Sequence, residues 1–483
     1  MPARPRLNPS RYREAEPLPE PHGNRRTRLT ERSRGIAQAP DAVDTWPVPP
    51  DPRRSERGRL GSRLFLCLAA LLFLQISCTS EPERRDLPDV QIDIPEEAST
   101  DTASQSPATT VPSYVADLPG RLAVLDAAGN LVTSNPDGSD EVVLAEIETG
   151  GSQVLQPTWS PDGRRVAWVH VEVTEAGGLS SVIATAGGDG TGPSEARTAV
   201  VPFYLSWDPT SSRIAYLGSP SEADIQLGIL EVAGRSSGTP LDAGQPFYLS
   251  WAPGGDQLLV HVGEDRLELL DLDGSLTTVA DRPGTFSAPV WTADGRTFVY
   301  ASVGAERQRL VVRDAEAENE RPVVSFDELI SFVVSPDGER IAFQVIEEQS
   351  VLPLSVIDVD TGEAVEITDA AIAAFFWSPD GERLLYLDPD PEDDQFWFRW
   401  GVWDGRSSFL TPRFVPSQLI AGAYLRFFEQ YAQSMNLWSP DGSAFAYPGT
   451  NERGEEGVWI QSARADRAPV LVADGDFVAW SPA

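Results

Sequence analysis

From residue 121 onward, short runs of apolar and β-branched residues alternate with turn residues. RVAWVHV begins at Arg165, RIAFQV at Arg340 and RLLYLD at Arg383, and each run follows a Pro-Asp-Gly sequence. Asp-Gly favours a tight reversal, because Gly tolerates positive φ and Asp can bond the nearby backbone. Runs of this length and composition between such turns predict short antiparallel β-strands.

One turn motif, WSPDG, returns along the chain with a regular spacing. Exact and looser copies begin at Trp159, Trp207, Trp251, Trp291, Val334, Trp377, Trp438 and Trp480. Consecutive copies stand 40 to 61 residues apart, and each unit has room for four short strands. A period near forty with four strands per unit predicts an all-β fold, a β-propeller of four-stranded blades.

The first and last units complement each other. Residues 121–146 contain the second, third and fourth strands of a unit, whereas DFVAWSPA from Asp476 matches a first strand. We expect the C-terminal strand to pair with the N-terminal strands, which closes the ring and leaves no exposed sheet edge there. The count is then eight blades, or seven if one weak unit is not a blade.

The repeat WSPDG-x-x-[IVL]-[AL]-[FYW] resembles the TolB-type, WD40-like (PD40) β-propeller repeat over residues 119–483. Such repeats occur in periplasmic and surface proteins and in propeller domains of prolyl-oligopeptidase-like peptidases. Two features depart from those proteins, since neither the separate α/β domain of TolB nor the hydrolase domain of the peptidases is readable in this sequence. The resemblance therefore implies the fold and a binding role.

Three segments precede the repeats. Residues 1–63 form an Arg- and Pro-rich arm with 14 arginines against 8 acidic residues, and we expect it to be disordered unless translation starts near residue 60. Leu64–Ile76 has the length of a signal-peptide core, and Ser77-Cys78 behind it resembles a lipoprotein cleavage site within 64–78. Residues 79–118, rich in Pro, Ser, Thr and acids, predict a disordered tether.

Two fates of this signal segment remain open. Lipidation of Cys78 would anchor the propeller to the outer face of a bacterial cytoplasmic membrane, and this alternative is favoured by the short apolar core and the small residue before Cys78. An uncleaved signal anchor would place the propeller on the same side, because the arginine-rich arm stays in the cytoplasm.

Composition restricts the chemistry. All 38 basic residues are arginine, 73 residues are acidic, and the net charge is −35, so the chain should repel nucleic acid. The two cysteines, Cys67 and Cys78, lie outside the repeats, and the three histidines are far apart, so neither a cofactor nor a metal site is expected. The acidic turn DPDPEDD could offer oxygen ligands to calcium, but a solvated turn is favoured. Its weak candidate ligands are Asp388, Asp390, Asp393 and Asp394.

We expect the functional residues to lie where the sequence departs from the repeat pattern. The step from Trp377 to Trp438 is the longest, and its excess, 413–434, has aromatic residues at helical spacing. With the neighbouring aromatic strand, this insertion supplies a candidate binding surface: Trp397, Trp400, Tyr424, Arg426, Phe427, Phe428 and Tyr431. The alternative is a helix that only plugs or covers the propeller.

The sequence therefore predicts a membrane-tethered propeller that binds a protein or small ligand at its face without catalysis. The alternative is a propeller hydrolase acting on glycans or peptides with carboxylates in its central channel as general acid and base. These two functions differ in one requirement. An enzyme needs at least two carboxyl groups close together in one pocket, with shifted pKa values.

Overall fold

The computed structural model describes residues 111–147, 152–174, 178–221, 224–233, 240–280, 282–316, 319–390 and 396–483. The chain divides into two compact units, 1–65 and 66–483, and all described residues belong to the second. The predictions for the arm, the signal core, Cys78 and the tether up to residue 110 lie outside the described residues. Within the described part, no helix is both long enough and apolar enough to span a bilayer.

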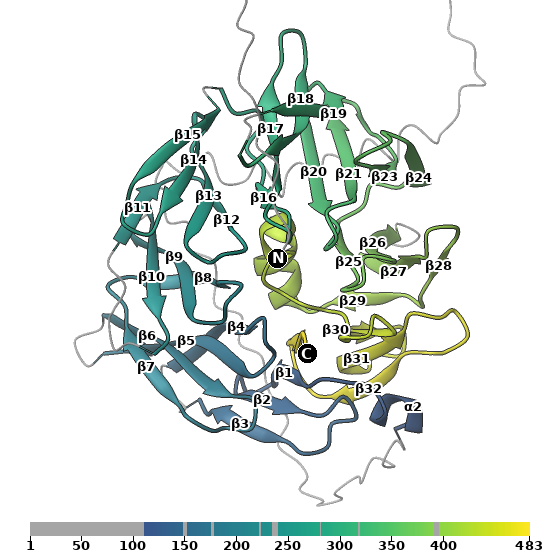
Figure 1. Ribbon diagram of the computed structural model, residues 1–483. Helices are drawn as coiled ribbons and strands as arrows, with labels where there is room; N and C mark the ends of the chain where they lie inside the picture. The colour runs from purple at the N-terminus through teal and green to yellow at the C-terminus, as the bar shows by residue number, and fades with distance from the viewer. Residues whose placement is uncertain are drawn as a thin grey trace, which may run out of the picture. The chain divides into compact units, whose positions relative to one another are not determined.

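The described chain is all-β, and its repeats fold into antiparallel sheets (Figure 1). Four of these sheets each contain four strands that follow one another in sequence. They are β4 (Ser152–Trp159), β5 (Arg165–Val173), β6 (Leu179–Gly187) and β7 (Ser194–Arg197); β8 (Val201–Trp207), β9 (Arg213–Ser221), β10 (Asp224–Glu231) and β11 (Pro240–Gly244); β12 (Phe247–Trp251), β13 (Gln257–Val262), β14 (Arg266–Asp271) and β15 (Leu276–Ala280); and β16 (Val290–Trp291), β17 (Thr297–Val303), β18 (Gln308–Asp314) and β19 (Glu320–Phe326).

The next two sheets depart from this pattern. A five-stranded sheet contains β20 (Leu329–Val334), β21 (Arg340–Glu347), β22 (Ser350–Val351), β23 (Leu354–Asp358) and β24 (Ala364–Thr368). An eight-stranded sheet contains β25 (Ala374–Trp377), β26 (Leu384–Asp390), β27 (Trp397–Trp403), β28 (Ser408–Leu410), β29 (Phe414–Pro416), β30 (Ala444–Asn451), β31 (Glu456–Ser462) and β32 (Val470–Ala473). Strand β29 lies between β27 and β30, so it joins two successive repeats into one sheet.

One sheet combines the beginning and the end of the repeat region. It contains β1 (Leu122–Leu125), β2 (Leu131–Ser134), β3 (Val142–Ala145) and β33 (Phe477–Trp480), and the short helix α2 (Ser113–Ala116) precedes it. Strand β33 pairs antiparallel with β1, with Leu122 opposite Trp480 and Leu125 opposite Phe477. Four consecutive buried residues in each strand explain why the chain brings these distant segments together.

The Ser-Pro-Asp-Gly turns close on themselves. Asp162 Oδ1 accepts hydrogen bonds from Ser160 Oγ at 2.6 Å and from the Arg164 amide at 3.1 Å. The following glycine, Gly163, has φ +68°, which only glycine adopts without strain. The same two acceptor bonds recur at Asp337, Asp380 and Asp441. The motif aspartates therefore stabilise turns, as their regular placement predicts.

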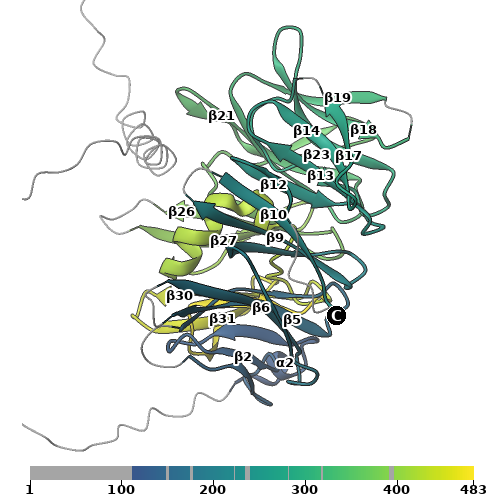
Figure 2. The same ribbon diagram turned by 90° about the vertical axis from the view of Figure 1, so that its left-hand side faces the viewer.

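The motif tryptophans link neighbouring repeats. In four of them the indole Nε1–H donates to the backbone carbonyl that precedes the equivalent position of the repeat before it: Trp207 to Thr158 (3.2 Å), Trp251 to Ser206 (3.2 Å), Trp377 to Val333 (3.0 Å) and Trp438 to Phe376 (3.4 Å). In the same way, Trp159 donates to Ala479 of β33 at 3.1 Å. The Nε1 of Trp291 is buried without a hydrogen-bond partner among the described residues. The other five N–H groups find partners across the contacts between neighbouring sheets, which Figure 2 shows side by side.

Candidate functional site

The insertion lies in the middle of the sheets (Figure 1). After β29 the chain makes helical turns at Ile420–Tyr424, Leu425–Phe427 and Phe428–Tyr431 (α3). The sequence predicted one amphipathic helix over 413–434. The structure instead has a short strand followed by three helical turns of different pitch. We call residues 417–435 the central plug.

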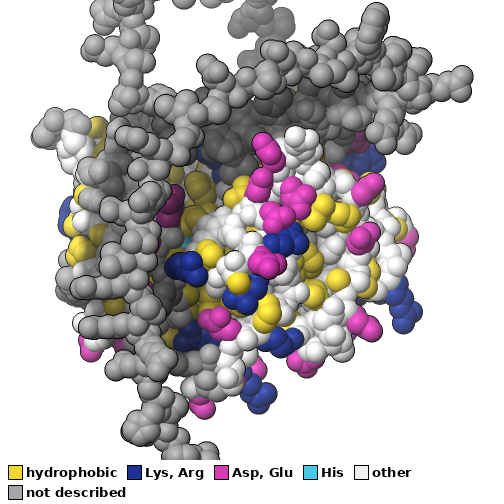
Figure 3. All heavy atoms as spheres, turned by 90° about the horizontal axis from the view of Figure 1, so that it is seen from above, with side chains coloured by type: hydrophobic (Ala, Val, Ile, Leu, Met, Phe, Trp, Pro, Cys, Tyr) yellow, Lys and Arg dark blue, Asp and Glu magenta, His cyan; other side chains and the backbone are white. Residues whose placement is uncertain are grey.

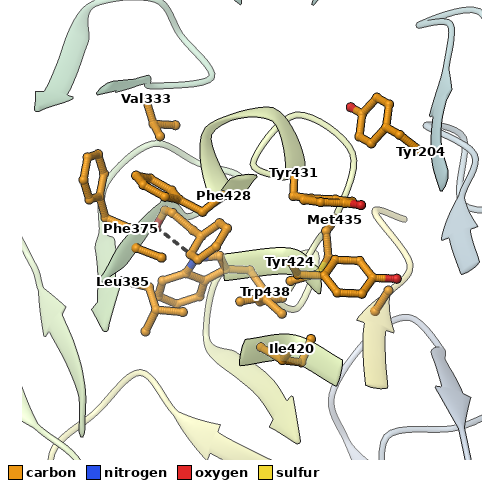
Figure 4. Close-up of a cluster of buried hydrophobic side chains, with 14 of the residues drawn as sticks. Tyr204, Val333, Phe375, Leu385, Ile420, Tyr424, Phe428, Tyr431, Met435 and Trp438 are labelled. Atoms are coloured by element: carbon orange, nitrogen blue, oxygen red, sulfur yellow. Dashed lines mark hydrogen bonds between the residues drawn. The ribbon is translucent and has the colours of Figure 1, made fainter. Parts of the chain in front are cut away.

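Apolar side chains anchor the central plug, as Figure 4 shows. Ile420, Tyr424, Phe428 and Tyr431 are buried, and the Tyr424 and Tyr431 rings lie 4.5 Å apart between centroids. Two further ring pairs reach neighbouring sheets: Phe428 lies 4.9 Å from Phe375 in β25, and Tyr431 lies 5.3 Å from Tyr204 in β8. Buried aromatic residues of this kind each contribute several kcal/mol to stability.

Polar contacts fix the plug to strands from several repeats. The Gln430 amide is buried; it donates to the Leu249 carbonyl and to the Tyr204 hydroxyl, each at 2.8 Å, and accepts from the Leu249 amide at 2.8 Å. Further along, Thr158 Oγ1 donates to the Ser434 carbonyl at 2.9 Å. Strands β4, β8 and β12 therefore contact one segment, which holds their spacing and fills the space between them.

The central plug also contains one carboxyl group, that of Glu429. Glu429 Oε1 accepts a hydrogen bond from the amide of Phe332 in β20 at 3.0 Å. Burial raises the pKa of Glu429 to about 8, and the hydrogen bond from Phe332 opposes that rise only in part. The nearby Tyr248 hydroxyl also has a raised pKa, again because of burial first and of Glu429 second, so it stays protonated. At neutral pH the plug thus carries a mostly protonated carboxyl.

The predicted binding surface divides into buried and accessible residues. Four of its members, Trp400, Tyr424, Phe428 and Tyr431, are buried and fill the core. This corrects the sequence prediction for those four, because a side chain that packs between sheets presents no surface to a partner. Trp397 is half-buried, Arg426 is exposed, and Phe427 is 47% exposed. The Arg426 guanidinium lies 5.8 Å from the centre of the Phe427 ring, in a cation–π contact.

Other exposed apolar side chains lie at the corresponding edge of the sheets. In a four-stranded repeat, the start of the first strand and the hairpin between the second and third strands lie at one edge; for example, Val201 pairs with Ser219. In Figure 2 the helical turns lie toward the edge at which β21 and β26 end. We call the exposed residues at this edge, with Phe427, the apolar rim: Val173, Leu179, Phe203, Val303, Leu329, Leu352, Phe396 and Phe427.

Elsewhere the surface mixes charge types. Figure 3 shows acidic side chains in small groups, interspersed with arginines and apolar residues, over the side that it faces.

The acidic segment does not begin as a solvated turn: Asp388 and Asp390 are half-buried in the last residues of β26, paired with β27, which corrects the sequence prediction for these two. Asp390 Oδ2 lies 2.7 Å from Arg399 Nε and 2.8 Å from Arg413 Nε. Burial first and the charge of Asp390 second raise the pKa of Asp388 to about 6. Asp393 and Asp394 lie outside the described residues. In the described part of the chain, no three His, Cys, Asp or Glu residues come together as a metal site would require.

The two histidines of the repeats occupy strands, as expected. His261 is buried, its Nδ1 lies 3.0 Å from the Ser287 carbonyl oxygen, and burial lowers its pKa. His170 Nε2 lies 3.9 Å from Glu172 on the same strand. The two belong to different sheets, β5 and β13, so they do not form one site.

No protein-family model and no curated protein matches the chain. Solved structures similar to it include TolB from Acinetobacter baumannii, with 13% identity over 58% of this chain and 74% of that chain and a TM-score of 0.37. The β-propeller domain of the Trilobed protease from Pyrococcus furiosus has 13% identity over 68% and 100% of the two chains, with a TM-score of 0.43. Oligogalacturonate lyase from Vibrio parahaemolyticus has 11% identity over 67% and 87%, with a TM-score of 0.42. The fold assignment rests on the sheets described above.

Proposed function

We propose that this chain is an exported, membrane-tethered β-propeller that binds a protein partner and catalyses no reaction. The observation that carries this proposal is the apolar rim, together with the exposed Phe427 and Arg426 of the central plug. Aromatic and arginine side chains are enriched at the cores of protein interfaces. Since the chain carries a net charge of −35, the partner should present an apolar contact region with neutral or basic surroundings.

The scaffold for this surface is a closed ring in our proposal. We count eight blades: five single sheets from β4 to β24, the two repeats joined in the eight-stranded sheet, and the sheet that contains β33. The pairing of β33 with β1 and the bond from Trp159 to Ala479 support closure of the ring. If the eight-stranded sheet acts as one blade, the count is seven.

Replacing Phe427 tests the rim. A photo-crosslinking residue at position 427 should give a protein adduct in membranes, whereas the same residue at Val365, which is exposed on the outer strand β24, should not. With the partner in hand, Phe427→Ala should weaken binding by about tenfold or more, because exposed aromatic residues at interfaces often carry a large share of the binding energy. Val365→Ala is the matched control. Equal adducts at both positions, or equal affinities of both variants, would refute the rim as the binding surface.

Cys78 should carry the membrane anchor. We expect mass spectrometry of the mature protein to find diacylglyceryl-Cys78 as the first residue, because the apolar core before it is the length of a signal peptide and not of a membrane span. Cys78→Ala should leave the protein unprocessed or released from membranes. Peptides from upstream of residue 64 in the mature protein would favour the uncleaved signal anchor instead.

A hydrolase acting on glycans or peptides is the alternative, and Asp388 is the observation that favours it. A carboxyl with a pKa near 6 could serve as a general acid. Its neighbour Asp390, however, already pairs with Arg399 and Arg413, so Asp390 could act as the second catalytic carboxyl only if both pairs broke. Turnover of a peptide or glycan by the purified protein, lost in a folded Asp388→Asn variant, would favour the enzyme.

A further inference from the structure

A cleft of about 470 Å³ opens between the sheet that contains β1 and β33 and the first full repeat, β4–β7. Trp159 and the glycine-rich segment 187–192 contribute to its lining. Cavities that hold small molecules typically have volumes of roughly 300 to 1,000 Å³, so this one is large enough for a small ligand. The cleft includes residues of the turn between β4 and β5, the first and second strands of the repeat. This turn lies at the edge of the sheet opposite to the apolar rim, which is at the hairpins between second and third strands.

Three arginines line this cleft: Arg121, Arg164 and Arg165. Arg121 is held in place, since its guanidinium donates to Asp140 Oδ2 at 2.8 Å and to the Asp140 carbonyl at 2.7 Å. Arg165 Nη2 donates to Thr185 Oγ1 and to the Gly192 carbonyl, each at 2.8 Å, which are both uncharged acceptors. The side chain of Arg164 is 84% exposed and lies 4.0 Å from Asp162.

Arg165 differs from the arginines at the same position of other repeats. Arg213 lies 2.6 Å from Glu231, Arg383 lies 3.3 Å from Asp380, and Arg340 lies 3.8 Å from Asp337. Arg165 has no carboxylate within ion-pair distance among the described residues. Because the hydrogen bonds of Arg165 go to neutral acceptors, its guanidinium has no ion-pair partner in this cleft among the described residues.

The glycine-rich segment 187–192 also lines the cleft. A Cβ on Gly188 would lie 2.7 Å from Cη2 of Trp159, so only glycine lets the segment pack against that ring. The Gly188 amide donates to the Arg164 carbonyl at 3.0 Å, which ties the segment to the turn that carries Arg164. Asp189 is also in the lining; its Oδ1 accepts from the Thr191 amide and hydroxyl, and these bonds lower its pKa.

We propose that this cleft binds a small organic anion, through a carboxylate or phosphate group held by Arg164 and Arg165. Guanidinium groups recognise both oxyanions through paired hydrogen bonds. The two aspartates of the lining, Asp162 and Asp189, would accept hydrogen bonds from hydroxyl or amino groups of the same ligand. Arg121 directly precedes β1, and its amide bonds Ser481 just after β33, so the bound ligand would also bridge the junction between the first and last repeats.

Calorimetric titration of the full-length protein tests the proposal, with inorganic phosphate and citrate as separate probes at constant ionic strength. We expect at least one probe to bind, and the stronger of the two identifies the oxyanion class. Arg164→Gln should lower that affinity about tenfold, as expected for loss of one charge-assisted contact. Because Arg164 is exposed, the variant should keep the fold.

Arg296→Gln is the matched control. Arg296 occupies the same turn position in another repeat, is also 84% exposed, and lies 3.5 Å from its turn aspartate, Asp294. It should leave the affinity unchanged. Absence of binding by both probes would overturn the proposal, and so would equal losses in Arg164→Gln and Arg296→Gln, which would indicate a general charge effect. Either outcome leaves the proposed partner surface at Phe427 unaffected.

Discussion

Removal of residues 475–483 should abolish cooperative folding of the propeller. The deletion takes away β33, whose residues Phe477, Val478 and Trp480 are fully buried. Loss of a buried aromatic side chain typically costs about 3 to 5 kcal/mol. Two such losses together reach the whole stability of a typical domain, about 5 to 15 kcal/mol.

Hydrogen bonds add to this loss. Without β33, the edge of β1 is exposed, Trp159 Nε1 loses its acceptor at Ala479, and the Pro119 carbonyl loses the Trp480 indole. An unpaired strand edge also favours aggregation, so the shortened protein should elute as soluble aggregate in size-exclusion chromatography.

A shorter deletion provides the control for this experiment. A protein that lacks only residues 481–483 keeps β33 and should retain a sharp thermal transition in circular dichroism, at a modestly lower temperature, because the bond between Ser481 Oγ and the Arg121 amide is lost. Equal melting temperatures for the full protein and the form ending at Asp474 would show that β33 does not hold the first and last repeats together.

Much of this architecture could be predicted from the repeat alone. In most repeats the motif fixes the turn chemistry, since Asp-Gly closes one reversal, and it places a large indole at every copy except Val334. Both features depend on residues close in sequence or on contacts that most repeats make in the same way. The pairing of β33 with β1 was also predictable, because the first unit lacks its first strand and the last unit has only a first strand.

The central plug and the cleft could not be predicted in this way. Gln430 bonds Leu249, which lies 181 residues away, and nothing in the pattern of the insertion says which repeat it will meet. The sequence also does not predict that Phe428 is buried and Phe427 exposed, because three helical turns of different pitch replace one regular helix. Arg165 is regular in sequence, and it is distinguished from Arg213 only by having no carboxylate partner within the part of the chain that the structure describes.

Stability should fall as pH rises from 5 to 9, and Glu429 should cause a measurable part of that fall. Its pKa is about 8 in the folded protein against an ordinary value of 4.5. Between these values the folded state binds a proton that the unfolded state has lost, so the free energy of unfolding decreases as pH rises. The contribution is fully present below pH 4.5 and lost above pH 8.

The size of the effect follows from the shift. Each pKa unit corresponds to about 1.4 kcal/mol, so the decrease attributable to Glu429 between pH 5 and pH 8 is at most on the order of 4 kcal/mol. Solvent still reaches part of this side chain, which reduces the value. A loss of even half that size is a large fraction of the stability of a domain.

Glu429→Gln separates this group from the other carboxyls, such as Asp388, that also titrate in this range. The amide keeps an oxygen that can accept from the Phe332 amide and cannot ionise. In urea denaturation, the variant should match the native protein at pH 5 and exceed its stability by about 2 kcal/mol or more at pH 8 to 9. Glu339→Gln, at an exposed turn position, should follow the native curve throughout. If the Glu429→Gln and native curves stay parallel across this range, the carboxyl is ionised in the folded state, and the plug is held with a charge at its centre.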